Sequence, residues 1–207
     1  MNPSVERLRA SFGDAIGRST IARDGITNVV VRAERLVEVM RWLRDTSGER
    51  YDYLVDVTAV EYRDQEHPLE VVYHLRSLDR PANLRVKVAL DPRGELAVDS
   101  ITPLWAGANW LEREAYDMFG IVFAGHPDLR RILMWETYAE GYPLRKDFPL
   151  RGRFSRAEQV RQALNTNPEA NYSLEELAIA ESYDELPADM RERMRRGERG
   201  MLRGPQE

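Results

Sequence analysis

The strongest constraint on the fold is the alternation in residues 83–90, NLRVKVAL, where every second residue is apolar. Arg85 and Lys87 stand between the apolar positions, so a strand over this segment would have one apolar side and one charged side. Such a strand is typical of an antiparallel sheet with one face against a core and the other in water. The turn-forming residues 91–94, DPRG, predict the end of the strand.

Other segments predict the rest of a sheet and two helices. The apolar runs at 51–63 and 69–78 predict two more strands, and Asp24-Gly25 predicts a hairpin between two short β-rich runs. Apolar residues three and four positions apart predict helices over 3–16 and 33–46. We therefore expect an α+β fold, a mixed, mainly antiparallel sheet with helices on one face.

A third helix is predicted over residues 108–119, ANWLEREAYDMF, and Gly120 is a typical helix stop. Its acidic residues raise the question of chemistry, because paired carboxylates can act as acid and base. Glu112 and Glu114 would be about 200° apart around the helix, so they could not face one substrate from the same side. The helix therefore does not predict a carboxylate pair.

The remaining charges of this helix allow two interpretations. Arg113 and Asp117 are four positions apart and would pair on the outer side of the helix. One interpretation is a charged helix face that is simply solvated. The other is a surface contacted by a partner, which Trp110 and Tyr116 favour because aromatic residues and arginine concentrate at interfaces.

An extended segment follows the third helix. Pro143 and Pro149 favour extended backbone, and Leu144 and Phe148 supply apolar anchors. An extended arm cannot satisfy its own backbone hydrogen bonds, so it runs over water or along a partner. Because the apolar anchors, which include Leu150, would be costly to leave in water, we expect residues 125–153, here named the strap, to lie along a partner.

Three parts are thus predicted along the chain. They are an α+β core domain over 1–124, the strap over 125–153, and a charged helical C-terminal tail over 154–207. The tail has sparse apolar positions, so we expect it to lie on another surface or to be partly mobile.

Composition excludes several classes of protein. The 207-residue chain has no cysteine, which excludes disulfides, iron–sulfur ligation and a thiol nucleophile. Its three histidines stand apart in sequence and predict no metal site, and no phosphate-loop or dinucleotide motif occurs. A net charge of -5 argues against nucleic-acid binding. No apolar run is long enough to span a membrane, and the N-terminus resembles no secretory signal.

His126 lies in a GHPD segment that predicts a turn. It has no neighbouring serine, cysteine or aspartate at the spacing of a catalytic triad. An alternative function from the residues alone is a stand-alone hydrolase or isomerase that uses Glu112, Asp117 and His126. The helical geometry disfavours it, because the carboxylates would point in different directions.

The same residues carry a resemblance to a known family. Their spacing is similar to the signature of the thirty-kilodalton subunit of respiratory complex I, the bacterial NADH-quinone oxidoreductase. The residues that carry this similarity are Glu112-Arg113-Glu114, Asp117, Met118-Phe119, His126, Arg130 and Ile132-Leu133. The segments GYPLRKDFPL and YDYLVDVTAVEY resemble the family as well. The likeness takes in most of residues 1–152 and none of the tail, and no fusion to the forty-nine-kilodalton subunit fits this length.

The resemblance implies a function without an active site of its own. It implies a non-catalytic structural subunit in the hydrophilic arm of a proton-translocating NADH:quinone oxidoreductase. Such a subunit binds no cofactor, since FMN and the iron–sulfur clusters lie in partner subunits. It lies on the cytoplasmic side of the bacterial inner membrane and docks on the forty-nine-kilodalton quinone-site subunit and its iron–sulfur neighbours. An equivalent scaffold in a membrane-bound hydrogenase or another quinone-linked dehydrogenase is the alternative.

By the same resemblance, residues of the third helix and of the strap are expected to contact partner subunits. These residues are Glu112, Arg113, Glu114, Asp117, His126, Arg130, Arg131, Tyr142, Leu144, Arg145, Lys146, Asp147, Phe148 and Arg151.

Overall fold

The computed structural model describes residues 2–62, 69–91, 94–135, 137–150, 152–155 and 158. Most of them belong to one compact unit, Met1–Ser155, which contains the predicted core domain together with the strap. The predicted helical tail lies almost wholly outside the described residues, so its structure stays a prediction.

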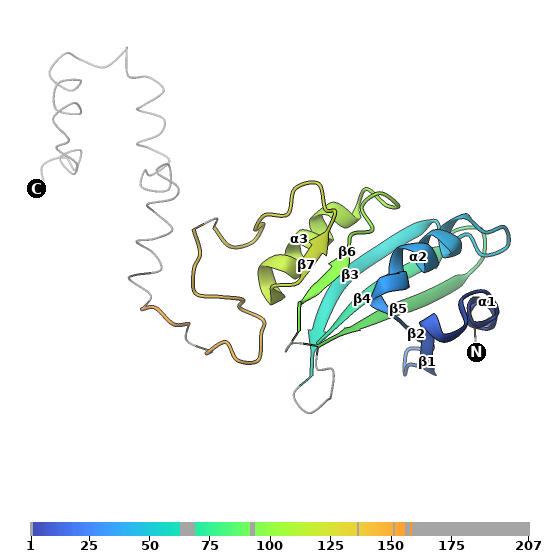
Figure 1. The fold of residues 1–207 in the computed structure, drawn as a ribbon, viewed down its shortest axis with the longest axis horizontal. Helices are drawn as coiled ribbons and strands as arrows, with labels where there is room; N and C mark the ends of the chain where they lie inside the picture. The colour runs from blue at the N-terminus through green and yellow to red at the C-terminus, as the bar shows by residue number, and fades with distance from the viewer. Residues whose placement is uncertain are drawn as a thin grey trace, which may run out of the picture. The chain divides into compact units, whose positions relative to one another are not determined.

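A five-stranded sheet forms the centre of the unit (Figure 1). Its strands are β1 (Ile16–Ile21), β2 (Thr27–Val31), β3 (Tyr53–Glu61), β4 (Leu69–Ser77) and β5 (Ala82–Leu90). The strand order is β1-β2-β5-β4-β3, and only the β2–β5 pair is parallel. The predicted mixed, mainly antiparallel sheet is therefore confirmed.

Three helices accompany the sheet: α1 (Pro3–Phe12), α2 (Leu36–Asp45) and α3 (Ala108–Phe119). The 3-10 turns η1 (Gly13–Ala15) and η2 (Ala33–Arg35) adjoin the first two. The first helix ends before the predicted residue 16, because Gly13 takes a positive φ of 53° that interrupts the helical path. The Asn2 side chain caps its start by accepting the Ser4 N–H at 3.0 Å.

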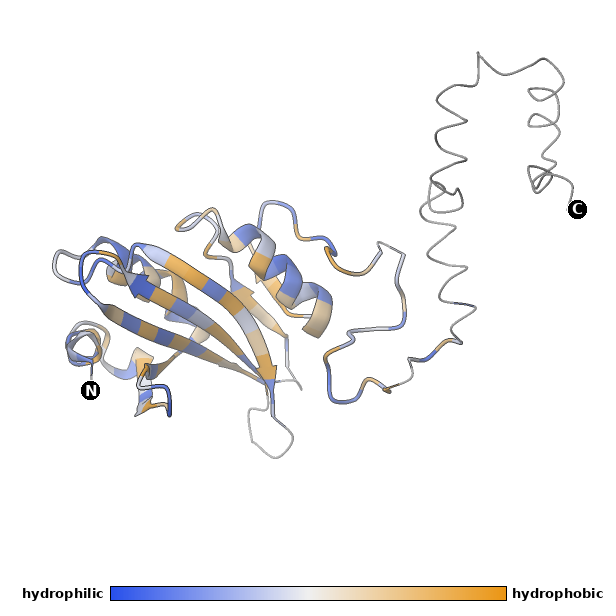
Figure 2. Ribbon diagram, turned by 180° about the vertical axis from the view of Figure 1, so that it is seen from behind, coloured by the Kyte–Doolittle hydropathy of each residue, from blue (hydrophilic) through white to orange (hydrophobic). Residues whose placement is uncertain are grey.

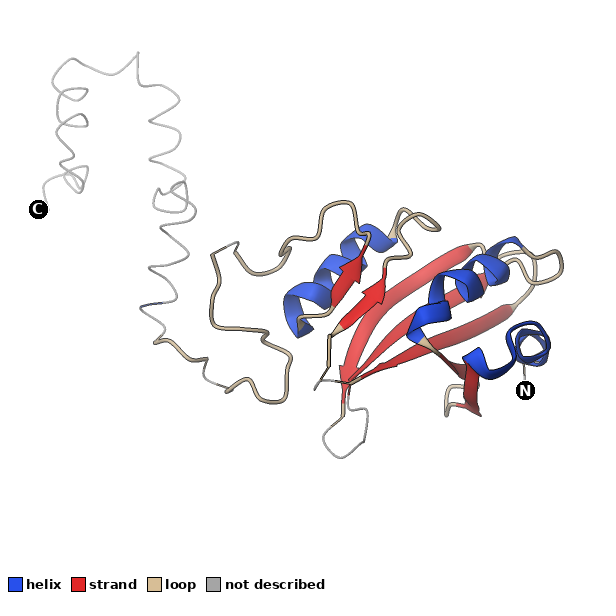
Figure 3. Ribbon diagram, viewed as in Figure 1, coloured by secondary structure: helices blue, strands red, loops and turns tan. Residues whose placement is uncertain are grey.

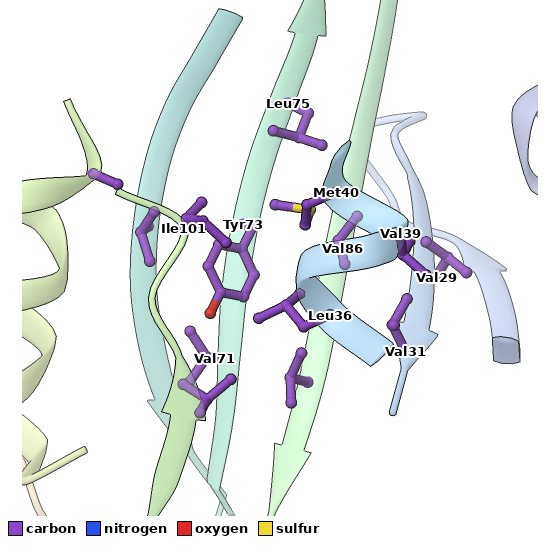
Figure 4. Close-up of a cluster of buried hydrophobic side chains, with 14 of the residues drawn as sticks. Val29, Val31, Leu36, Val39, Met40, Val71, Tyr73, Leu75, Val86 and Ile101 are labelled. Atoms are coloured by element: carbon purple, nitrogen blue, oxygen red, sulfur yellow. The ribbon is translucent and has the colours of Figure 1, made fainter. Parts of the chain in front are cut away.

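The core lies between α2 and one face of the sheet. Figure 4 shows Leu36 and Met40 of α2 facing Tyr73 and Val86 of the central strands. On the opposite face Arg85 binds other strand residues, and Figure 2 shows polar and apolar residues alternating along the strands. This division follows from the two-residue period of a strand, as the alternation of residues 83–90 predicts.

A smaller unit of structure lies beside strand β3. Strands β6 (Ala97–Asp99) and β7 (Val122–Ala124) form a parallel pair, and α3 joins them in the sequence (Figure 3). Helix α3 packs along β3, and the Trp105 Nε1–H donates to the Asp52 carbonyl at 3.0 Å just before that strand. The strap leaves β7 and returns over α3, so this helix positions it.

Gly120 ends α3 at the predicted residue, and its lack of a side chain leaves room for a residue of the strap. Its φ of 80° lies in the left-handed region, which a side chain disfavours. The ring of Tyr142, from the strap, lies where a Cβ of residue 120 would stand. Gly120 therefore both ends the helix and admits the strap.

We predict that Gly120→Ala lowers the free energy of unfolding of the purified chain by about 2–4 kcal/mol, from backbone strain and overpacking together. Urea unfolding measures the change. Gly107→Ala is the matched control, because a Cβ at position 107 meets nothing within 4 Å, and it should cost less than about 1 kcal/mol. Equal losses in the two variants would contradict the role of Gly120.

Candidate functional site

The charged residues of α3 are mostly inside the molecule. Glu112 and Asp117 are fully buried, and Arg113 is nearly so. The expected Arg113–Asp117 pair on an outer face is wrong, because the strap covers that flank of the helix. Arg113 instead donates through Nε to the Arg130 carbonyl and through Nη2 to the Arg131 carbonyl, each at 3.1 Å.

Asp117 binds the strap through both carboxylate oxygens. Its Oδ2 accepts the backbone N–H groups of Ile132, Leu133 and Met134 at 3.0, 2.7 and 2.8 Å. Its Oδ1 accepts Nη1–H of Arg131 at 2.7 Å. Burial alone raises the pKa of this carboxyl, but the four donors outweigh it and hold the pKa below its usual value. Asp117 is therefore charged at neutral pH and fixes three consecutive strap residues.

Glu112 binds the loop before α3. Its Oε1 accepts the Ile101 N–H at 2.8 Å, and its Oε2 accepts the hydroxyls of Ser100 at 2.6 Å and Thr102 at 3.2 Å. Burial raises the pKa of this carboxyl, and the hydrogen bonds from Ser100 and Ile101 offset only part of that rise.

His126 lies in a turn at the start of the strap. Its Nδ1 accepts the Asp128 N–H at 3.0 Å, so Nε2 carries the proton and faces the Asn109 carbonyl at 3.1 Å. Nε2 also lies 4.0 Å from Glu112 Oε2, and neither side chain has exposed surface. A hydrolase that uses these two groups is disfavoured, since no substrate can reach them in this structure.

Further along the strap, other carboxylates accept its backbone N–H groups. Glu61, at the end of β3, accepts the Lys146 N–H at 2.7 Å and lies 3.7 Å from Arg145 Nε. Glu140 accepts the Arg153 N–H at 2.6 Å. The expectation that the strap cannot satisfy its own backbone hydrogen bonds is thus wrong in part, because carboxylates of its own chain accept several of its N–H groups.

The strap exposes several large apolar side chains among its exposed charged ones. Leu133 and Leu144 expose 61% and 52% of their surface, and Ile132 and Leu150 are also exposed, as is Phe154 just after the strap. Large apolar side chains in one short segment are a typical interface feature.

The predicted interface residues fall into four groups. Buried side chains are those of Glu112, Arg113, Asp117 and His126. Partly buried residues are Arg131, Tyr142, Arg145 and Phe148, and exposed ones are Glu114, Arg130, Leu144, Lys146 and Asp147. Arg151 lies outside the described residues. Contact with a partner stays a prediction for every one of them, and the buried ones already have partners in their own chain.

Sequence reasoning missed two carboxylates and two apolar residues of this site. Glu61 binds a strap residue far from it in sequence, and Glu140 binds a residue within the same irregular segment. No spacing rule predicts either contact. Ile132 and Leu133 stand in the signature segment, yet their exposure depends on how Asp117 orients the strap.

The described residues offer neither a metal site nor a membrane span. Among them, no group of three or more histidine or acidic side chains is placed to hold a metal ion. No helix in the described ranges is long and apolar enough to cross a membrane.

The family described as "Respiratory-chain NADH dehydrogenase, 30 Kd subunit" matches residues 29–154, from within β2 to one residue past the strap. The C subunit of an NADH-quinone oxidoreductase from Citrifermentans bemidjiense is 46% identical over 151 residues, which are 73% of this chain and 91% of that protein. The protein of the same description from Roseiflexus sp. (strain RS-1) is 49% identical over 146 residues, 70% of this chain and 82% of its own.

Solved structures show the same fold. One described as "Nqo5 of the trypsin-resistant fragment (1-134) in P63 form" is 31% identical, with a TM-score of 0.52 over 61% of this chain and 96% of that one. A chain of "the membrane-bound sulfane sulfur reductase (MBS), an archaeal respiratory membrane complex" is 20% identical, with a TM-score of 0.59 over 78% of this chain and 89% of that one. The second likeness concerns the fold alone.

We predict that Asp117→Asn releases the strap, because an amide cannot accept all the donors that face this carboxylate. The expected loss of stability is about 2–4 kcal/mol. Trypsin should then cleave the purified variant after Arg131 much faster than it cleaves the wild-type chain. Asp79→Asn is the control, since Asp79 forms an exposed ion pair with Arg50. Unchanged cleavage at Arg131 in Asp117→Asn would show that another contact holds the strap.

The two buried carboxylates of α3, Asp117 and Glu112, predict opposite pH trends. The pKa of Asp117 is lowered from 3.8, so its stabilising effect is present above pH 3.8 and is lost as pH falls through the lower folded value. The pKa of Glu112 is raised from 4.5, so its effect is present below pH 4.5 and is lost as pH rises through the higher folded value.

Unfolding of the wild-type chain, Asp117→Asn and Glu112→Gln across pH 3 to 7 measures both trends. The stability advantage of wild type over Asp117→Asn should shrink on acidification, and its advantage over Glu112→Gln should shrink on alkalinisation. The same trend in both comparisons would contradict the assignment.

Proposed function

The chain belongs to the family of the respiratory-chain NADH dehydrogenase 30 Kd subunit, and we propose that it serves there as a structural subunit without an active site of its own. The observation that carries the proposal is the strap, which is held in one conformation by buried carboxylates and presents apolar side chains outward. A binding segment fixed before docking loses little conformational entropy on binding, which favours tight association.

The proposed place of the chain is the hydrophilic arm of a proton-translocating NADH:quinone oxidoreductase, on the cytoplasmic side of the membrane. Its relatives are subunits of NADH-quinone oxidoreductases, which supports this place. The proposed partners of the strap are the forty-nine-kilodalton quinone-site subunit and its iron–sulfur neighbours. FMN and the iron–sulfur clusters would belong to other subunits of the complex.

The role of such a subunit is positional. Electron transfer slows steeply as the distance between redox centres grows, so the rate depends on neighbouring subunits staying in place. The chemistry of the site agrees with this role. Glu112 and Asp117 bind groups of their own chain, and their contacts join α3 to the loop at 100–102 and to the strap.

We predict that the double variant Leu133→Asp with Leu144→Asp prevents assembly, because two charges would be buried at the interface without partners. The chain itself should stay folded, as both residues are more than half exposed. Purification of the complex from cells that carry the variant, followed by NADH-dependent quinone reduction, measures assembly and activity. Both should fall at least tenfold.

Leu78→Asp is the matched control, because Leu78 is 65% exposed and lies outside the strap. It should leave the yield and the activity of the complex unchanged. Full assembly of the double variant would exclude the strap as the docking segment. Full quinone reduction by a complex that lacks this chain would overturn the structural role itself.

A further inference from the structure

Helix α3 exposes only a narrow strip of its surface. Among its twelve residues only Trp110 and Glu114 are classed as exposed, and Trp110 exposes 61% of its surface. The two are four positions apart, so their Cβ atoms are about 5–6 Å from each other on one side of the helix. Helical side chains lean towards the N-terminus, which brings the Glu114 carboxylate over the turn that carries Trp110.

The strip borders the strap. Asn109, Arg113 and Asp117, which bind strap residues, span about 80° of the helix at 100° per residue. On the same scale Trp110 and Glu114 follow at about 100° and 140° from Asn109. The Trp110–Glu114 pair is thus continuous with the side of α3 that carries the strap.

The cation next to this pair in the sequence, Arg113, is already bound, and so is Arg131 of the strap. Arg113 donates to two backbone carbonyls, and Arg131 is held by Asp117. Within the described ranges no ion pair or hydrogen bond joins the Glu114 carboxylate to a cation. An exposed indole and an exposed carboxylate therefore stand side by side without the positive charge that both attract.

We propose that Trp110 and Glu114 together bind one arginine side chain of the partner subunit that docks on the strap. The guanidinium plane stacks on the indole, and two of its N–H groups donate to the carboxylate of Glu114. This inference rests on the proposed function, because it assigns a contact within that interface.

Arginine fits this pair better than other side chains do. Tryptophan is the best aromatic receptor for a cation, and arginine occurs in such contacts more often than lysine. A planar guanidinium also binds a carboxylate through two parallel hydrogen bonds, which an ammonium group cannot do. A purely apolar partner would leave Glu114 buried without a counter-charge.

The first test measures release of the chain from the purified complex, with Trp110→Ala, Glu114→Gln and the double variant. Removing one side of a buried charge pair costs enough to speed release roughly thirtyfold. Each single variant should reach that range, and the double variant should add little, since both side chains bind the same group. The controls Leu78→Ala and Glu6→Gln change an exposed leucine and an exposed glutamate elsewhere and should leave release unchanged.

Changes below twofold in both single variants would overturn the proposal. So would single effects that multiply in the double variant, because independent contacts would then explain them. All these variants are compared in the assembled complex. Failure of the proposed function would give a different result, because the wild-type chain would then be absent from the purified complex.

The second test identifies the bound group. A photoreactive benzoylphenylalanine in place of Trp110, irradiated in the complex, should cross-link to a peptide of another subunit, within a few residues of an arginine. Cross-linking only to lipid, or only to a peptide without arginine, would overturn the proposal.

Discussion

The arrangement of the strap depends on one buried ion, the carboxylate of Asp117. A carboxylate without solvent is costly unless donors surround it, and an extended segment has backbone N–H groups that need acceptors. The strap supplies the donors that the carboxylate needs, and the carboxylate supplies an acceptor for the strap, because three consecutive strap amides and Arg131 donate to Asp117. The helix can bury this charge only where the strap returns over it, and the strap has a defined path only where the helix supplies the charge.

This dependence explains how the fold serves a structural role. The five-stranded sheet and α2 form a rigid base, and α3 is fastened to it along β3 and through the Glu112 contacts with the loop at 100–102. Asp117 joins the strap to α3, and Glu61 and Glu140 bind the strap further along. Its apolar residues, together with Trp110 and Glu114, are therefore presented to a partner in fixed positions.

The sequence predicts the elements of this fold better than its contacts. Residues 83–90 alternate strictly, and the strand Ala82–Leu90 follows that pattern because the two-residue period is a local property of the backbone. The helix Ala108–Phe119 has the predicted bounds, since Gly120 ends it locally. The burial of Asp117 is not local, because it depends on a segment fifteen to seventeen residues away. A charged residue on a helix therefore predicts an exposed side chain only where no later segment of the chain packs over that part of the helix.

The most direct measurement is hydrogen exchange of the strap amides in the isolated chain and in the purified complex. The amides of Ile132, Leu133 and Met134 should be protected in both, because Asp117 accepts them within the chain. The amides of Asp147 and Leu150, on the exposed part of the strap, should gain protection only in the complex. Equal exchange of the Asp147 and Leu150 amides in the two states would contradict docking through the strap. Rapid exchange of the amides of residues 132–134 in the isolated chain would contradict the role of Asp117.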